Sequence, residues 1–348
     1  MLKCSLAIVQ PDIVFVWNLH FLEQPFLNAL NELSCNKVFL LTDNWLIAAC
    51  QPDFIADYFV RQVYGCGNRS LSLLKRVGMK LRSGQVGWEH LWGFLRGRMS
   101  GTTQSTCDFK GSAVFASHFM QQLYAQANIR FSDPVIIHHG TMPLPEPSEE
   151  RPDRDQLIEP GELRLLFAGR VVEIKGVHTI IEALPGICRN LRHLSVSLTI
   201  VGDTRDQPYL KRLQSLLEKL NLQHIVNFQP PVQETALPQL FDAHDIYVFP
   251  SLYEPFALTL IHALRAGIPT VASRAGGTPE IIFERETGFL FDAGRPEELA
   301  DRVIEMAQSH ALRKVISSRS IATAEDFTFD RMINDIEKHL DRVHQEQL

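Results

Sequence analysis

Two positively charged side chains, Arg170 and Lys175, stand in the segment FAGRVVEIKGVHTIIEAL, between an apolar run ending at Gly169 and a helical pattern starting near Gly176. Cations at the amino end of a helix oppose its dipole, so a helix selected for stability alone would carry acids or a serine cap there. Free backbone N–H groups, a guanidinium and an ammonium can instead converge on a diphosphate. The pattern therefore predicts an anion site, with two solvated charges in a surface turn as the alternative.

A carboxylate follows a second buried strand pattern, in the segment DIYVFPSLYEPFALTLIHALRAG. Glu254 comes after the strand, and Pro255 is expected to open a helix whose first turn offers free N–H groups. Because ligands of open α/β sheets bind outside the carboxyl ends of the strands, this placement favours a ligand contact. A helix-start signal without a ligand is the second interpretation.

The segment SRAGGTPEII has a structural explanation and a functional one. Thr278 as a cap, Pro279 at the first helical position and Glu280 in the first turn describe a helix start. Gly276 and Gly277 would let the backbone approach a ligand, although they also suffice to make a turn.

Short apolar runs alternate with helical patterns from Leu163 onward. Runs such as LTIV and IYVF are apolar at every position, which is typical of parallel strands covered on both faces. The first half repeats the theme with DIVFVW, KVFLL, SAVFAS and PVIIHH as expected strands, and a proline-rich, charged segment between the halves predicts a linker. The predicted fold class is therefore α/β, with two Rossmann-like, doubly wound parallel-sheet domains.

These patterns also predict the domain boundaries. They are an N-terminal domain over residues 1–145 with a helical insertion over about 51–107, a linker over 146–161, a C-terminal domain over 162–325, and a terminal helix over 326–348. In the terminal helix one face is apolar, so it needs a surface to lie on, and we expect the N-terminal domain to provide it.

Composition excludes several classes of protein. The chain has 348 residues, with 34 Lys and Arg against 40 Asp and Glu, and its net charge of −6 disfavours a dedicated nucleic-acid binder. The six cysteines lack metal-ligand spacing, which predicts reduced thiols and no structural zinc. No apolar run approaches the ~18 residues of a membrane span and no signal peptide is evident, so a cytoplasmic protein is expected.

The order of the motifs GR…KG, IVGD, FPSLYEPF with ALRAG, AGGTPEII and ETGFLFD resembles the donor-binding half of retaining glycosyltransferases of family 4. The resemblance covers roughly residues 163–308 in register, which makes it more specific than any single motif. It implies the GT-B fold, in which two Rossmann-like domains face a cleft. The first half resembles the acceptor domain more weakly, through PDIVFVWNLH, LLTDNWLI, VFASHF and PVIIHHG.

The resemblance implies a role for each matching residue. The diphosphate of the donor would be held by Arg170 and Lys175, the transferred sugar would contact Glu254, and with Asp43 these are the expected catalytic residues. The expected substrate-binding residues are Gly169, Gly202, Asp203, Phe228, Gln229, Pro255, Phe256, Ala257, Leu258, His262, Gly277 and Glu280. No metal and no resident cofactor are expected, because the nucleotide-diphosphate sugar is the donor substrate.

Three features depart from the family pattern. The family usually has a second glutamate eight positions after the first, which grips the ribose hydroxyls, and this chain has His262 there. Imidazole cannot accept from two hydroxyls, so weaker ribose affinity or a rearranged grip is expected. A histidine is often found just before the aspartate of the acceptor domain, whereas this chain has Thr42 before Asp43. The opening segment MLKCSLAIVQPDIVF resembles the helix before a later strand, so the N-terminal domain is expected to lack one or two βα units.

The segment 71–101 is basic and amphipathic, with six Lys and Arg residues, one Glu and two tryptophans. Such a face suits anionic lipid headgroups, which predicts a peripheral contact with the inner face of the plasma membrane. A solvated insertion whose tryptophans pack inward is the alternative.

The predicted function is retaining transfer of a sugar from a nucleotide-diphosphate sugar to a glycan or lipid-linked acceptor, without a metal, in cell-surface polysaccharide or glycolipid biosynthesis. Two alternatives stay open. One is a non-catalytic nucleotide-sugar-binding fragment or paralogue, which His262 and the short N-terminal domain favour. The other is a sugar-nucleotide epimerase of the same architecture.

Overall fold

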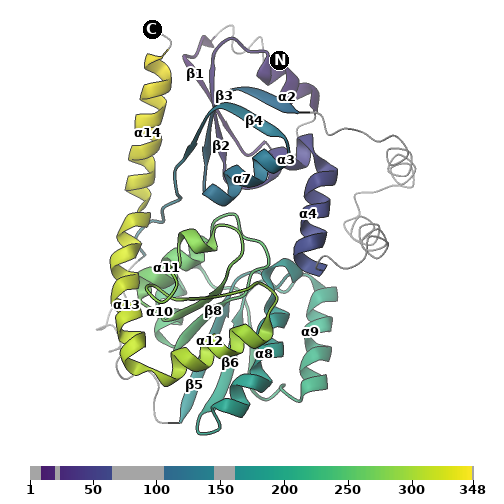
Figure 1. The fold of residues 1–348 in the computed structure, drawn as a ribbon, viewed down its shortest axis with the longest axis vertical. Coiled ribbons are helices and arrows are strands. Elements are labelled where there is room, and N and C mark those ends of the chain that lie inside the picture. Colours follow the sequence, from purple (N-terminus) through teal and green to yellow (C-terminus); the bar gives the residue numbers. More distant parts are fainter. Residues whose placement is uncertain (1–8, 20–23, 65–105, 145–160, 347–348) are drawn as a thin grey trace, which may run out of the picture. The chain divides into compact units, whose positions relative to one another are not determined.

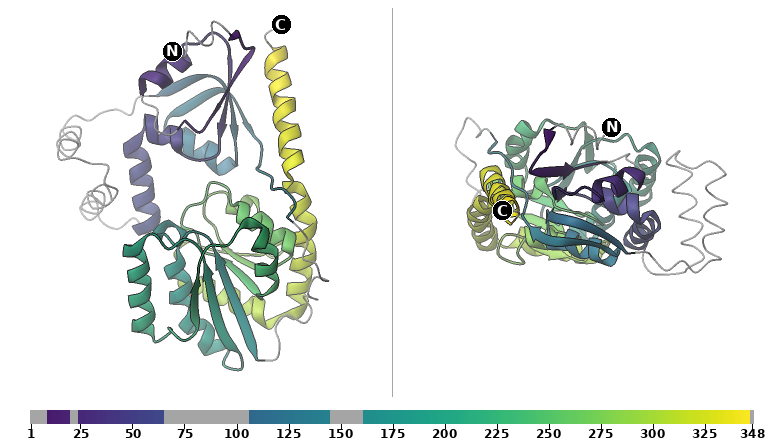
Figure 2. Two further views of the ribbon diagram at one scale, coloured as in Figure 1. Left: turned by 180° about the vertical axis from the view of Figure 1, so that it is seen from behind. Right: turned by 90° about the horizontal axis from the view of Figure 1, so that it is seen from above.

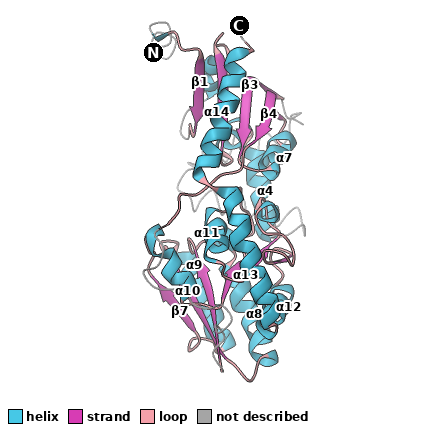
Figure 3. Ribbon diagram, turned by 90° about the vertical axis from the view of Figure 1, so that its left-hand side faces the viewer, coloured by secondary structure: helices cyan, strands magenta, loops and turns pink. Residues whose placement is uncertain are grey.

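The computed structural model describes residues 9–19, 24–64, 106–144 and 161–346, and it divides the chain into two compact units. Unit 1 comprises Met1–Ile137 and Ile336–Leu348, and unit 2 comprises His138–Asp335. Each unit is built on a parallel sheet, drawn as magenta arrows in Figure 3. The α/β class with two Rossmann-like units is thus confirmed.

Unit 1 has, in its described residues, a four-stranded sheet with the order β1-β2-β3-β4. The strands are β1 (Ile13–Trp17), β2 (Asn36–Leu41), β3 (Cys107–Phe115) and β4 (Ile129–Ile136), and every pair is parallel. The helices are α2 (Gln24–Asn31), α3 (Trp45–Cys50), α4 (Pro52–Tyr64) and α7 (His118–Gln126). The central strands carry the continuous apolar runs of the sequence, since Val38, Phe39 and Val114 are fully buried.

Unit 2 contains a six-stranded parallel sheet with the order β10-β9-β8-β5-β6-β7. The strands are β5 (Glu162–Ala168), β6 (Ser195–Val201), β7 (Val226–Gln229), β8 (Ile246–Phe249), β9 (Thr270–Ser273) and β10 (Phe289–Phe291). Because β5 pairs with both β6 and β8, the strand order reverses at β5. The carboxyl ends of β5 and β8 therefore form the switch point where open α/β sheets bind ligands.

Four helices connect strands of unit 2, namely α8 (Val177–Asn190), α9 (Gln207–Leu220), α10 (Leu237–Asp242) and α11 (Leu258–Ala266). Two more, α12 (Pro296–Gln308) and α13 (His310–Ala324), follow the last strand, β10. Four single 3-10 turns are η1 (Glu173–Lys175), η2 (Glu234–Ala236), η3 (Thr278–Glu280) and η4 (Glu325–Phe327). Figures 1 and 2 show α8 and α9 side by side in this unit. Asp206 caps α9 by accepting from the backbone N–H of Tyr209 at 3.1 Å.

The last helix, α14 (Phe329–Gln345), passes from unit 2 into unit 1. Its second half packs on the sheet of unit 1, where Val343 joins Val38 and Val114 in one apolar cluster. The Asn36 side chain donates to the Val343 carbonyl at 2.7 Å, and Ser112 Oγ lies 2.6 Å from His339 Nε2. The apolar face of α14 thus packs against the sheet of unit 1.

The boundary between the units differs from the predicted one. Unit 2 begins at His138, whereas the sequence predicts the linker from residue 146. The reason is local pairing: the Thr141 N–H donates to the Phe327 carbonyl at 3.0 Å, and the Phe329 N–H donates to the Thr141 carbonyl at 3.2 Å. These bonds tie residues just before the proline-rich segment to unit 2, which apolar patterns alone do not reveal.

Several predictions fall on residues that the structure does not describe. They are the predicted linker, the basic segment 71–101 and most of the insertion predicted over 51–107. The first part of that insertion is described and forms α4. Among the described helices, none is long and apolar enough to cross a membrane.

Candidate functional site

The loops after β5 and β6 bring two predicted glycines together. Gly169 follows the end of β5, and Gly202 follows the end of β6. A Cβ atom on Gly202 would lie only 1.7 Å from the Gly169 carbonyl oxygen, so a side chain at position 202 would force the two loops apart. Arg170 and Asp203 directly follow these glycines, so both lie at the carboxyl ends of neighbouring strands.

Lys175 and Glu254 form an ion pair at the switch point. Lys175 closes η1 after β5, Glu254 follows β8, and the Lys175 Nζ to Glu254 Oε2 distance is 2.5 Å. Both groups are largely withdrawn from solvent, with side-chain exposures of 18% and 9%. The ammonium also lies 5.6 Å from the centre of the Phe249 ring, a favourable contact for a cation.

Gly276 fixes the backbone of Glu254. Its φ angle is +59°, and a Cβ atom there would lie 1.9 Å from the Glu254 carbonyl oxygen. The Gly277 N–H donates to that same carbonyl at 2.9 Å. The glycine pair predicted to approach a ligand therefore approaches the backbone of the candidate catalytic residue.

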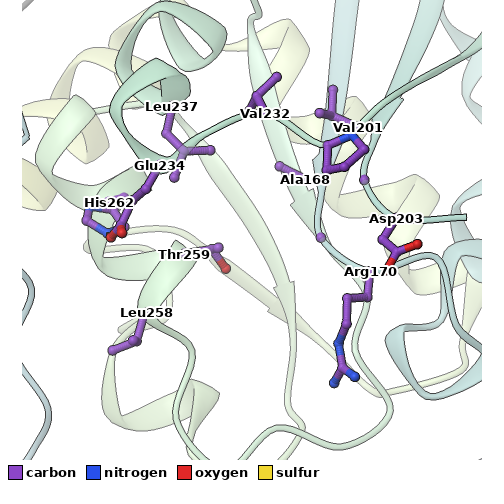
Figure 4. A pocket seen from close by; sticks show the side chains of 13 residues that line it. Ala168, Arg170, Val201, Asp203, Val232, Glu234, Leu237, Leu258, Thr259 and His262 are labelled. Carbon is purple, nitrogen blue, oxygen red and sulfur yellow. The ribbon is translucent and has the colours of Figure 1, made fainter.

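Unit 2 contains a cavity of about 390 Å³, and neither Lys175 nor Glu254 is among its lining residues. It is lined by Ala168, Gly169, Arg170, Val201, Gly202, Asp203, Pro231, Val232, Glu234, Leu237, Leu258, Thr259 and His262. Figure 4 shows Arg170 and Asp203 on one side of the cavity and Glu234 with His262 on the other. The exposed Arg170 side chain makes no ion pair with any described residue. Its guanidinium is therefore available to an anion in this cavity.

The two carboxylates of the cavity have different partners. Asp203 Oδ2 accepts from Arg205 Nε at 2.6 Å, and these contacts with Arg205 lower the pKa of Asp203. Glu234 Oε1 lies 2.7 Å from His262 Nε2. Burial lowers the pKa of His262, and the hydrogen bond that the ring donates to Glu234 only partly opposes that effect, so the imidazole is neutral near pH 7.

The family model of the glycosyl transferases group 1 matches residues 148–322, half of the chain and nearly all of unit 2. The match includes the cavity, the Lys175–Glu254 pair and the glycines that position them. The chain belongs to the glycosyl transferases group 1 family.

Curated relatives of this family member match about half of its length. The D-inositol 3-phosphate glycosyltransferase of Pseudarthrobacter chlorophenolicus is 30% identical over 178 residues, which are 51% of this chain and 42% of that protein. The spore coat protein SA of Bacillus subtilis is 30% identical over 191 residues, which are 53% of this chain and 50% of that protein. The chain thus spans about half the length of the curated relatives it matches.

Solved structures match the fold of the family member over both units. The Anabaena protein HepE, in complex with UDP and glucose, aligns with a TM-score of 0.66 at 21% identity and covers 98% of this chain and 80% of its own. A sucrose-phosphate synthase from Thermosynechococcus elongatus aligns with a TM-score of 0.67 at 15% identity and covers 99% and 77%. The predicted GT-B fold is confirmed by these matches.

The structure corrects one predicted element of this candidate site. Helix α11 begins at Leu258 and not at Pro255, because Ala257 is extended, with φ −92° and ψ 95°. Phe256 is 7% exposed and stacks on His138 with ring centres 5.3 Å apart, and burying that ring outweighs the preference of proline for a first helical position. The free N–H groups at the helix start thus belong to Leu258 and its successor, not to Phe256.

The segment around Glu280 also differs from the prediction. Thr278 begins the single turn η3 and its hydroxyl caps nothing, since it is buried without a partner among the described residues. The Glu280 carboxylate lies 3.0 Å from His138 Nε2, a partner that the sequence did not indicate. Glu280 therefore lies in a cluster with His138 and Phe256, outside the residues that line the cavity.

The remaining predicted residues have structural partners. Asp43 lies in unit 1, where its Oδ1 accepts from the Trp45 N–H at 2.8 Å at the start of α3. Phe228 packs against the core of unit 2, and the Gln229 carbonyl accepts from the Gly202 N–H at 3.1 Å. A catalytic role for Asp43 stays a prediction.

Sequence reasoning missed part of the cavity lining, namely Ala168, Val201, Pro231, Val232, Glu234, Leu237 and Thr259. Pro231 and Val232 lie in the turn after β7, directly after the predicted residues Phe228 and Gln229. Nothing in a single sequence marks Glu234, which reaches His262 from 28 residues away. Among the described residues, no group of three or more His, Cys, Asp or Glu side chains could hold a metal ion.

Proposed function

We propose that the protein is a retaining glycosyltransferase that moves a sugar from a nucleotide-diphosphate sugar to a hydroxyl of a glycan or lipid-linked acceptor. The observation that carries this proposal is the Lys175–Glu254 pair at the switch point, in which Lys175 belongs to the same loop after β5 as Arg170, a lining residue of the cavity. A cation for phosphate and an anion for sugar hydroxyls stand next to each other there. A nucleotide-diphosphate sugar has these two groups in direct succession.

The chemistry assigned to the cations is stabilisation of the leaving group. When the bond between the anomeric carbon and the diphosphate oxygen breaks, negative charge grows on the diphosphate. Arg170 and Lys175 stabilise that charge from fixed positions, where preorganised cations contribute most. Their two positive charges supply the function that a metal ion has in other transferases.

Glu254 is assigned to the sugar, and its carboxylate orients the hydroxyls of the transferred ring. Lys175 neutralises Glu254 while the donor is absent and contacts the diphosphate when it is bound. The acceptor oxygen attacks the face of the sugar from which the diphosphate leaves, and the proton of the acceptor hydroxyl passes to the departing phosphate oxygen. Asp43 remains our candidate on the acceptor side.

We further propose that the acceptor belongs to cell-surface polysaccharide or glycolipid synthesis, at the cytoplasmic face of the plasma membrane. The support is the basic segment 71–101 with its tryptophans. Liposome flotation tests this part: binding should rise with the fraction of anionic lipid, and binding that is indifferent to lipid charge would contradict it.

Donor turnover tests the proposed reaction. The protein is incubated with UDP-, GDP-, ADP- and dTDP-sugars, starting with UDP-glucose because the similar Anabaena structure holds UDP and glucose. Release of nucleoside diphosphate is followed by chromatography, and the anomeric configuration of the released or transferred sugar by NMR. We expect release from one donor class with the configuration retained.

Two other outcomes separate the alternatives. A sugar epimerised at one carbon would indicate an epimerase, and saturable donor binding without release would indicate a non-catalytic binder, which His262 favours. Arg170→Ala and Lys175→Ala should each abolish turnover. Arg189→Ala and Lys211→Ala serve as matched controls, because both side chains are exposed on α8 and α9 away from the cavity.

A further inference from the structure

Glu234 offers the cavity an unused hydrogen-bond acceptor. Its Oε1 is bonded to His262, while its Oε2 makes no hydrogen bond with any described residue, and the side chain is 63% exposed. Asp203, the other carboxylate of the cavity, is engaged on both oxygens, with Oδ1 accepting from the Arg205 N–H at 3.0 Å and Oδ2 from Arg205 Nε at 2.6 Å. Glu234 is thus the carboxylate that is free to receive a ligand.

His262 fixes the direction of this carboxylate. The imidazole is neutral and a carboxylate only accepts, so Nε2 carries the hydrogen and donates it to Glu234. The ring is 2% exposed and its Nδ1 is buried without a partner in the described residues. A buried imidazole therefore uses its single N–H to hold an exposed carboxylate, and leaves its other nitrogen unsatisfied to do so.

The charges across the cavity indicate which part of a ligand faces Glu234. Phosphates are drawn to Arg170, on the opposite side in Figure 4, and are repelled by Glu234. The group at Glu234 is therefore uncharged and donates hydrogen bonds. In a nucleoside diphosphate the ribose carries such a group, two adjacent hydroxyls one sugar ring away from the phosphates. A carboxylate with acceptor sites on both oxygens matches this diol.

We propose that Glu234 binds the ribose diol of the donor nucleotide, that His262 is its positioning residue, and that the site selects ribonucleotide over 2′-deoxyribonucleotide donors. This inference rests on the proposed function, since it assigns the cavity to the donor. It restores, from η2, the carboxylate that position 262 on α11 does not supply. The replacement of the family's second glutamate by His262 then moves the ribose contact to another residue and does not remove it.

Isothermal titration with matched nucleotide pairs tests the inference. The pairs are UDP and 2′-deoxy-UDP, GDP and 2′-deoxy-GDP, and ADP and 2′-deoxy-ADP, and the readout is the ratio of the two dissociation constants within each pair. Removing a hydroxyl that donates to a charged acceptor costs about tenfold in affinity. We expect the parent protein to bind the ribonucleotide of its preferred base about tenfold more tightly. The ratio cancels any general effect of charge on phosphate binding.

Variants assign the ratio to Glu234. Glu234→Ala should bring it close to one, whereas the surface control Glu218→Ala on α9 should leave it unchanged. His262→Ala should lower the ratio and His262→Gln should retain it, because the Gln amide can donate in place of Nε2. The double variant Glu234→Ala with His262→Glu should recover the ratio, since it moves the carboxylate to α11.

The outcomes separate this inference from the function on which it rests. If no nucleoside diphosphate binds, the proposed function and the inference are both wrong. If nucleotides bind but the parent ratio is near one, or Glu234→Ala keeps the full ratio, the inference alone is wrong. A ratio that is lost in Asp203→Asn and kept in Glu234→Ala would assign the diol to Asp203, and it would also overturn the inference about Glu234.

Discussion

The Lys175 ammonium donates to Glu254 Oε2 across 2.5 Å, although 79 residues separate the two positions in the sequence. The pair exists because β5 and β8 are neighbouring parallel strands, so the loops that follow them start at the same edge of the sheet. The Phe249 ring lies beside the ammonium, and Gly276 and Gly277 pack on the Glu254 backbone. Two charges of opposite sign are thus held at the switch point, where they form an ion pair with each other.

Replacing Lys175 by Met should destabilise unit 2. The Glu254 carboxylate, 9% exposed, would lose its counter-ion. Breaking a buried pair costs about 3–5 kcal/mol, and the partial exposure of Lys175 lowers our expectation to about 1–3 kcal/mol in the free energy of unfolding by urea. The double variant Lys175→Met with Glu254→Gln should recover part of the loss, because no charge is then left unpaired. A loss no larger than that of the exposed control Lys211→Met would contradict this prediction.

Gly276→Ala should displace Glu254. The added Cβ would meet the Glu254 carbonyl oxygen in a left-handed backbone conformation, so the loop must move. We expect a loss of about 1–3 kcal/mol in the free energy of unfolding, from the clash and the unfavourable φ angle together. Donor affinity should fall in parallel. Gly186→Ala is the matched control: Gly186 lies inside α8, where alanine should be neutral or stabilising by up to ~1 kcal/mol. Equal effects of the two changes on donor affinity would be evidence against the role of Gly276.

His178 should make the stability of unit 2 dependent on pH. Burial, with a smaller contribution from Arg212, lowers its pKa to about 4. The Tyr209 hydroxyl accepts the His178 backbone N–H at 3.1 Å and lies 2.8 Å from Nδ1, which matches a neutral ring accepting there. The folded state therefore binds fewer protons than the unfolded state between pH 6.5 and about 4, and stability falls as the pH falls through this window.

Urea unfolding at several pH values measures this dependence. We expect His178 to account for a loss of up to about 2–3 kcal/mol between pH 6.5 and 4. In His178→Gln the slope of stability against pH should decrease over the same window, since the amide does not titrate. An unchanged slope would show that His178 is not the group responsible.

The Arg164–Asp245 pair should be essential for the fold of unit 2. Asp245 precedes β8 with a side chain that is 1% exposed, and it receives bonds from the Arg164 backbone N–H at 2.7 Å and from the guanidinium at 3.0 Å. Asp245→Ala leaves these donors without their acceptor, so we expect a cost of about 3–5 kcal/mol in the free energy of unfolding. Asp301→Ala, on the exposed face of α12, should cost under ~0.5 kcal/mol. Similar values for the two variants would refute the assignment.

The parts of the fold that the sequence predicts are those with a local signal. The strand Ile246–Phe249 is apolar at every position because both faces of it are covered, and all four residues are buried. Lys175 and Glu254 could be expected near each other because each follows a parallel strand. Parallel strands end at one edge, so proximity in space follows from position along the strand.

The parts that the sequence misses depend on contacts between distant segments. Pro255 is a good first residue of a helix, yet the burial of the next side chain, Phe256, against His138 keeps the chain extended. Glu234 carries no motif of its own, and only the packing of α10 against α11 brings it to His262. A histidine that replaces a carboxylate signals that something is rearranged, but the position of the substitute is set by tertiary structure.

The central claim is that Arg170 and Lys175 bind a diphosphate, and the most direct test is the affinity ratio between a nucleoside monophosphate and its diphosphate. Titration calorimetry is performed with UMP and UDP, or the pair of the preferred base, at a temperature where every variant is folded. The account predicts that the parent binds the diphosphate about 10- to 100-fold more tightly, since each cation contributes about tenfold. It predicts a ratio near one in the double variant Arg170→Ala with Lys175→Gln, and an unchanged ratio in Arg189→Ala with Lys211→Gln. A double variant that discriminates as well as the parent would contradict the diphosphate site and the transferase mechanism derived from it.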